Sequence, residues 1–156
     1  MRHASRLLAT WLGAALLAVA PAFAAEAPPL PQFVDETASA GLDGTYAGGW
    51  QYMVGGGAAV FDCSGDGFPD LMLAGGEEKA RLFVNRSAVG GPLAFERQAS
   101  GLEIEAITGA YPIDIDSDGV MDVVLLRVGE NLLMRGKGDC RFEEANAAWG
   151  FDGGDA

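Results

Sequence analysis

The chain has 156 residues, of which 22 are acidic and 10 basic, with one His, two Cys and a formal net charge of −12. This acidic balance argues against a partner rich in phosphate, such as nucleic acid or an anionic membrane surface, because like charges repel. The length suits a single domain, and the charge favours solubility and the binding of cations.

The first 24 residues have the pattern of a signal peptide. Arg2 and Arg6 give a basic start, residues 7–20 form an uncharged apolar run, and residues 22–24 (Ala-Phe-Ala) offer a cleavage site. The run is short for a membrane span, which needs about 20 residues; an uncleaved N-terminal anchor is the alternative. Cleavage after Ala24 leaves 132 residues with a formal charge of −14 and no membrane span. We expect export to the periplasm or secretion, more in keeping with a bacterium.

A Pro-rich, extended leader follows at residues 25–31. The first structured element is expected at "QFVDETASAGL" (residues 32–42). Beyond it, Tyr46, Trp50 and Tyr52 are expected to fill the space between this element and the next strands; a ligand groove is the alternative.

The rest of the chain repeats itself. "GAAVFDCSGDGFPDLML" (residues 57–73) matches "GAYPIDIDSDGVMDVVLL" (residues 109–126) with an offset of 52 residues. Downstream, "ARLFVNRS" (80–87) answers "NLLMRGKG" (131–138), and "AFERQASGL" (94–102) answers "RFEEANAAWGF" (141–151). Repeats of about 40 to 50 residues indicate a propeller or an array of units.

Each unit contains four short apolar or β-branched runs bounded by Gly and Asp, which is typical of strands. The runs are "AAVF" or "YPI", "LML" or "VVLL", "RLFVN" or "NLLMR", and a fourth that begins at Phe95 or Phe142. Four strands in each repeat make a propeller blade. The expected fold is therefore all-β: an incomplete β-propeller of about two four-stranded blades plus a leading strand.

The two cysteines, Cys63 and Cys140, accompany an export signal, so they could form one disulfide in an oxidising compartment. Two separate thiols, or a bond to another chain, remain open, because the sequence does not fix the distance between them. With no second Cys or His nearby, neither resembles a zinc ligand.

Seven of the 22 acidic residues lie in two short loops, residues 62–70 (loop 1) and 114–122 (loop 2). Each loop places oxygen-bearing side chains at positions 1, 3, 5 and 9 and Gly at position 6. Such side chains can converge on a hard cation, and Ca²⁺ takes 6 to 8 oxygen ligands, including backbone carbonyls. The candidate ligands are Asp62, Ser64, Asp66, the carbonyl of Phe68 and Asp70 in loop 1, and Asp114, Asp116, Asp118, the carbonyl of Val120 and Asp122 in loop 2.

These loops differ from an EF-hand, which needs a bidentate Glu at position 12. Position 12 is Leu73 or Leu125, inside an apolar strand, so we expect calcium loops within β-hairpins. An Asx/Gly turn without an ion is the alternative, but two equivalent clusters of carboxylates would repel without a counter-ion. Ser64 replaces a carboxylate and is expected to weaken the first site.

The motifs "GGGAAVFDCSGDGFPDLMLAGG", "RLFVNRS" and "RFEEANAAWGF" resemble FG-GAP/VCBS repeats, especially those of cartilage-acidic-protein-like proteins with an ASPIC/UnbV region. The resemblance covers about residues 32–151. It implies blades of a propeller like the head domain of integrin α-subunits, with Ca²⁺ bound by the hairpin loops. Ser64, in place of the usual Asp or Asn, and Cys140, in place of a turn Gly, depart from the family pattern.

A closed propeller needs more blades than two, so further blades of the same protein are expected, with this chain as the N-terminal part. The one His, His3, lies in the expected signal peptide, and no side-chain set suits catalysis, so we expect no enzyme. The expected function is that of an exported, calcium-stabilised scaffold that binds a protein or glycan. The alternative is an accessory part of a longer exported hydrolase with its catalytic residues beyond residue 156; a calcium-free array of hairpins is a more distant one.

Overall fold

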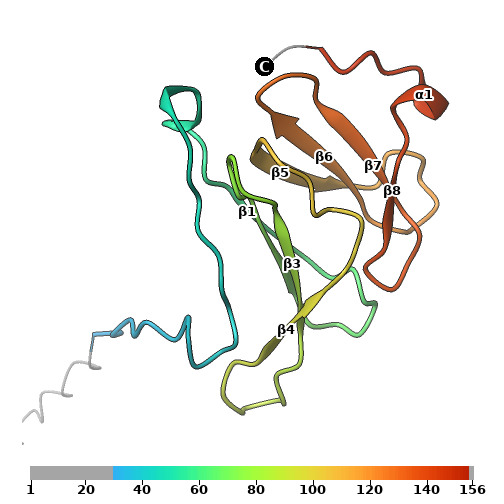
Figure 1. Cartoon of the computed structure of the whole chain (residues 1–156). Coiled ribbons are helices and arrows are strands. Elements are labelled where there is room, and N and C mark those ends of the chain that lie inside the picture. Colours follow the sequence, from blue (N-terminus) through green and yellow to red (C-terminus); the bar gives the residue numbers. More distant parts are fainter. Residues whose placement is uncertain (1–29, 155–156) are drawn as a thin grey trace, which may run out of the picture. The chain divides into compact units, whose positions relative to one another are not determined.

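The computed structural model describes residues 30–154 (Figure 1). The expected signal peptide and most of the leader lie outside the described residues. The chain divides into two units, residues 1–33 and 34–156. Within the first, residues 30–33 are exposed and have no regular secondary structure. Both sheets belong to the second unit.

The first sheet is a meander of four consecutive antiparallel strands, β1 (Ala58–Phe61), β2 (Asp70–Leu73), β3 (Arg81–Asn85) and β4 (Phe95–Gln98). Its strands alternate side chains between two faces, as a strand must. Ala59, Phe61 and Met72 point to one face and are buried, whereas Val60, between the first two, is exposed.

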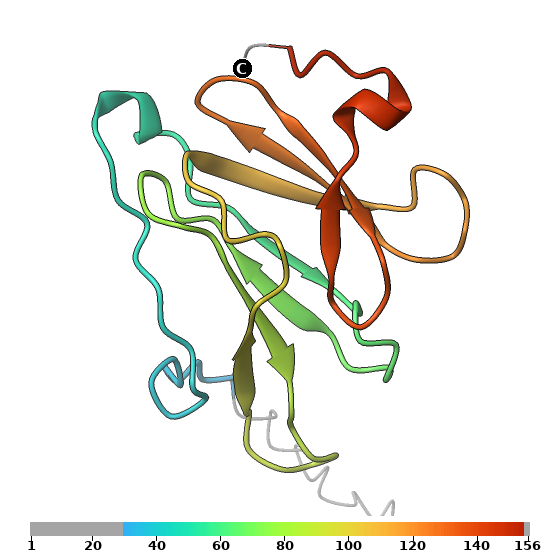
Figure 2. The ribbon, with the colours of Figure 1, turned by 45° about the vertical axis from the view of Figure 1, so that its right-hand side comes forward.

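The second sheet repeats this order with β5 (Ile107–Ile113), β6 (Asp122–Arg127), β7 (Leu132–Gly136) and β8 (Phe142–Glu144). The register repeats too: Phe61 pairs with Asp70 in the first sheet and Ile113 with Asp122 in the second. The predicted strands and their fourfold grouping are thus confirmed, and two four-stranded sheets with almost no helix agree with an incomplete propeller of two blades (Figure 2).

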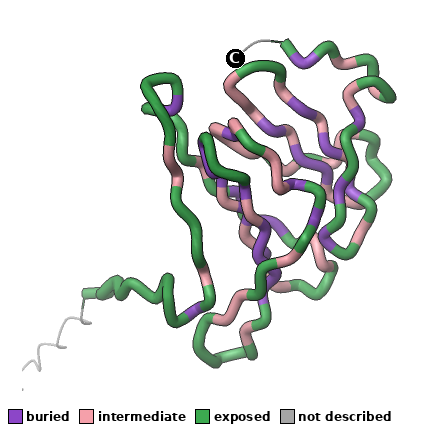
Figure 3. Tube along the Cα trace, viewed as in Figure 1, coloured by how far each residue is buried: buried purple, intermediate pink, exposed green. Residues whose placement is uncertain are grey.

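The core lies between the two sheets (Figure 3). The inner strands β1 and β5 approach closely, since a Cβ added to Gly57 would lie 3.2 Å from the Cα of Gly109. Phe61 meets Phe142 edge-on, with ring centroids 6.2 Å apart. The side chains that fill the interface come from both sheets: Ala59, Phe61, Met72, Leu82 and Val84 from the first, and Ile107, Val123, Leu125, Leu132, Met134 and Phe142 from the second.

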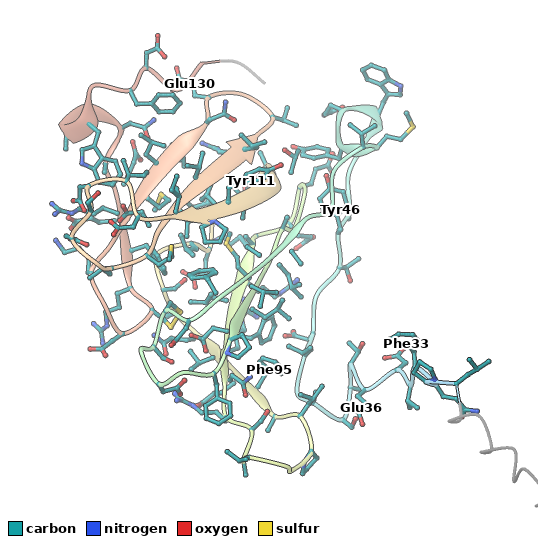
Figure 4. All side chains as sticks on the ribbon, turned by 180° about the vertical axis from the view of Figure 1, so that it is seen from behind. Phe33, Glu36, Tyr46, Phe95, Tyr111 and Glu130 are labelled. Atoms are coloured by element: carbon teal, nitrogen blue, oxygen red, sulfur yellow. A yellow bond between two sulfur atoms is a disulfide. The ribbon has the colours of Figure 1, made fainter. Side chains whose placement is uncertain are left out.

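The outward face of the second sheet corresponds to the inward face of the first. The 52-residue offset places Tyr111 at the position of Ala59 and Ile113 at the position of Phe61. Tyr111, labelled on β5 in Figure 4, is 60% exposed and Ile113 is 50% exposed, against 3% for Ala59 and 7% for Phe61. The face that is buried in the first sheet is therefore exposed in the second sheet.

The segment before β1 differs from expectation in two respects. The leading strand does not form: residues 37–41 are a turn, and a single parallel bridge joins Ala47 to Gly76. Of the three aromatic residues, Tyr52 is buried and Tyr46 packs against the core and donates its hydroxyl to the carbonyl of Tyr52, whereas Trp50 is 82% exposed. The prediction that Trp50 fills the space before the first strands was therefore wrong.

In the described part of the chain, helix is limited to two short pieces, the 3-10 turn Trp50–Tyr52 and α1 (Asn146–Trp149). Within residues 30–154, no helix is long and apolar enough to cross a membrane.

Candidate metal loops

The two acidic loops occupy the same place in their sheets. Loop 1 joins β1 to β2, and loop 2 joins β5 to β6. Position 4 (Gly65 or Ser117) and position 6 (Gly67 or Gly119) have positive φ in both, which fits the glycines and costs some strain at Ser117. Both loops are thus hairpin connections with a similar backbone conformation. Position 12 of each lies in a strand, as predicted.

The carboxylate at position 1 organises each loop from inside. Asp62 accepts the N–H groups of Gly65 at 2.7 Å and Gly67 at 2.9 Å, and the hydroxyl of Ser64 at 3.3 Å. Asp114 accepts the N–H groups of Asp118 and Gly119, both at 3.1 Å. The bond from Gly67, with smaller contributions from its neighbours, lowers the pKa of Asp62. The ionised form is thereby favoured, as a cation ligand requires.

The carboxylates at position 5 hold the loop ends. Asp66 accepts the N–H of Phe68 at 2.9 Å, and Asp118 accepts that of Val120 at 2.8 Å. The backbone N–H at position 7, next to each candidate carbonyl ligand, is therefore held by the carboxylate at position 5.

The carboxylates at position 9 are fully buried and anchor each loop to the third strand. Asp70 accepts the N–H of Asn85 at 2.8 Å with one oxygen and that of Cys63 at 2.9 Å with the other. Asp122 accepts Gly136 and Ile115 in the same way, both at 2.8 Å. These N–H groups replace the hydrogen bonds to water that each buried carboxylate has lost. Position 9 thus fixes loop geometry in addition to any role toward an ion.

Cys63 and Cys140 form a disulfide, which settles the pairing that the sequence left open. It joins loop 1 to the turn between β7 and β8, and the backbone N–H of Cys140 also bonds to the carbonyl of Cys63 at 3.1 Å. Both sulfurs lie near Asp70 Oδ2, at 3.1 and 3.4 Å. A disulfide sulfur is not a thiolate, so the group of Cys63, Asp70 and Cys140 is not a metal site.

Loop 2 gathers its carboxylates more closely than loop 1. Among the described residues, Asp114, Asp116 and Asp122 each contribute an oxygen within 4.8 Å of the others. Two oxygens bound to one Ca²⁺ at 2.3–2.6 Å lie no more than about 5 Å apart, so this donor set fits a single Ca²⁺. Loop 1 has no equivalent trio of carboxylates, because its position 3 is Ser64.

The sequence reasoning missed one residue of this site. Arg135 Nη2 of β7 lies 2.7 Å from Asp116 Oδ2 and 3.4 Å from Asp118 Oδ2. The signal was present in the repeat, since the aligned third strands place Val84 where the second unit has Arg135. A guanidinium at this place supplies positive charge to the carboxylates that would bind an ion.

The comparison with known families addresses the same segment. Residues 62–125 match the FG-GAP-like repeat family model. The match begins at position 1 of loop 1 and ends inside β6, so it contains both loops and the four strands that connect them, β2 to β5. It supports the reading of the chain as an FG-GAP/VCBS repeat protein with a propeller-like scaffold. No curated protein matches the chain.

Proposed function

We propose that this chain is an exported, Ca²⁺-binding segment of a β-propeller that serves as a structural or protein-binding scaffold rather than an enzyme. The observation that carries the proposal is the convergence of Asp114, Asp116 and Asp122 in loop 2. Hard carboxylate oxygens at this spacing suit Ca²⁺ better than the smaller Mg²⁺, which keeps its waters. When bound, the ion neutralises the cluster and stiffens the hairpin.

Export is supported by the signal pattern of residues 1–24 and by the Cys63–Cys140 disulfide, because disulfides persist in oxidising compartments. The finer resemblance to cartilage-acidic-protein-like ASPIC/UnbV proteins belongs to the same proposal. The uncovered face around Tyr111 and Ile113 supports a further blade as its occupant. The partner we propose for the assembled scaffold is a protein or a glycan.

The test is a thermal melt of residues 25–156 in millimolar Ca²⁺ and again in excess EGTA. Binding at 100 times Kd stabilises the folded state by about 2.7 kcal/mol, so a clear rise in Tm is expected with Ca²⁺. Asp118→Ala should lose the part of this rise that loop 2 contributes. Asp43→Ala removes the same charge from an exposed position outside both loops and should keep it. Equal melting temperatures in Ca²⁺ and EGTA for the unmutated protein would exclude the loops as calcium sites.

A further inference from the structure

Two differences between the units compensate each other in charge, one within the loop and one on the third strand. Position 3 is Ser64 in loop 1 and Asp116 in loop 2, and the aligned position on the third strand is Val84 in the first sheet and Arg135 in the second. Among the described residues, the three carboxylates of loop 1 form no ion pair, whereas loop 2 carries four carboxylates and pairs two of them with one guanidinium. Both sites have the same formal charge of −3.

We propose that Arg135 is the resident counter-cation of loop 2 and sets the affinity of that loop for Ca²⁺. The proposal rests on the calcium function proposed above. Arg135 pairs with Asp116 at 2.7 Å and also lies 3.4 Å from Asp118. It therefore neutralises the one carboxylate that loop 2 has and loop 1 lacks. It therefore offsets the advantage in affinity that Asp116 gives loop 2 over loop 1.

The effect has a definite sign and a modest size. A fixed positive charge next to the site repels an arriving divalent ion and must be displaced from the carboxylates or tolerated beside it. The Arg135 side chain is 40% exposed and that of Asp116 22%, so water and salt screen the interaction. Two charges of +2 and +1 about 5 Å apart in a watery environment correspond to roughly a tenfold change in affinity.

The same pairing predicts the behaviour of the loop without Ca²⁺. When the guanidinium is absent, four carboxylates face one another with no counter-charge, and the folded state loses stability in EGTA. Added salt should restore part of this loss, because screening replaces the missing cation. An arginine that merely packs against the sheet would show no such salt dependence.

The experiment compares Arg135→Gln with Lys137→Gln by calorimetric Ca²⁺ titration, both in a background where Asp62→Asn disables loop 1. Lys137 stands on the same hairpin but pairs with Glu143 at 2.9 Å, so its substitution removes an equal charge outside the loop. We expect Arg135→Gln to bind Ca²⁺ about five to ten times more tightly than Lys137→Gln and to have the lower Tm in EGTA at low salt.

The outcomes separate this proposal from the calcium function itself. Equal dissociation constants for the two variants, with Ca²⁺ bound by both, overturn the role of Arg135 and leave the calcium function standing. Binding by Arg135→Gln alone supports the role of Arg135 and removes loop 2 of the unmutated chain as a calcium site. Absence of binding in both overturns the role of Arg135 and excludes loop 2 as a calcium site, while the melt of the unmutated protein still tests the calcium function of loop 1.

A second pair of variants covers the case in which Arg135→Gln does not fold without Ca²⁺. Asp116→Ser gives loop 2 the side-chain set of loop 1 but keeps the guanidinium, and Asp116→Ser with Arg135→Val reproduces both residues of the first unit. The double variant should bind Ca²⁺ several times more tightly than the single one. Equal affinity in this pair would also overturn the role of Arg135.

Discussion

The disulfide should be the largest single contribution to stability that can be removed without touching the core strands. It connects residues 77 positions apart and joins loop 1 of the first sheet to the β7–β8 turn of the second. Replacing Cys63 and Cys140 by Ala, or reducing the bond, frees the unfolded chain from this constraint while the folded sheets keep their ladders.

The size of the loss follows from the length of the closed loop. The chain-entropy relation gives about 4.5 kcal/mol at 25 °C for a separation of 77 residues, within the range of about 2–5 kcal/mol typical of native disulfides in small secreted domains. A domain of this size has a total free energy of unfolding of about 5–15 kcal/mol. We therefore expect the reduced protein to be close to its limit of stability at 37 °C.

The assay is urea unfolding in EGTA of the oxidised protein, the dithiol-reduced protein and the Cys63→Ala/Cys140→Ala variant. The reduced form retains both sulfur atoms, so its comparison with the Ala variant separates the cross-link from the packing of buried Cys140. A loss of less than about 1 kcal/mol in the reduced form would refute the reasoning, since it would mean that the unfolded chain is already constrained or that the bond strains the folded one.

Three further measurements test the geometry. Phe61→Ala should cost about 3–5 kcal/mol, as for a buried aromatic residue, whereas Ile113→Ala at the equivalent position should cost below about 1 kcal/mol because that side chain is half exposed; equal losses in urea unfolding would contradict the assignment of faces. Gly101→Ala should cost more than about 2 kcal/mol, since the φ of Gly101 is +94° and an added Cβ would meet a backbone oxygen. Gly90→Ala should cost about 1 kcal/mol, because Gly90 has a φ of +72° but open space around it. A smaller loss for Gly101 would show that the segment between β4 and β5 moves aside. The lowered pKa of Asp62 stabilises the folded state fully above the ordinary value of 3.8, and this contribution disappears as the pH falls through the lowered value, so in EGTA the Tm should fall more steeply below about pH 4 than in Asp62→Asn; parallel curves would contradict the loop hydrogen bonds.

The sequence was sufficient for the strands and the loops because their signals are local. Alternation of apolar residues, Gly at position 6 and the 52-residue offset place each hairpin without knowledge of its neighbours. The register pairs Phe61↔Asp70 and Ile113↔Asp122 follow from the same spacing. That the two acidic loops bind Ca²⁺ stays a prediction.

The features that the sequence did not reveal depend on contacts between distant segments. The disulfide requires the β7–β8 turn to lie beside loop 1, and the pairing of Arg135 with Asp116 requires β7 to lie next to β6 in register. The exposure of Trp50 and the absence of a leading strand have a similar cause, because the segment before β1 follows the edges of the sheet through a few isolated hydrogen bonds, such as that from Ala47 to Gly75.

The division of the core between two meanders also fixes the order in which it can form during synthesis. The ladder of the first sheet is complete once Gln98 has emerged, since all of its pairs join residues between 58 and 98. Its apolar face, however, has to wait for β6, β7 and β8, the last of which carries Phe142 and ends at Glu144. For some 46 residues of synthesis the nascent chain exposes Phe61 on a finished sheet. This interval is the time in its life when the chain is most open to chaperones and to aggregation.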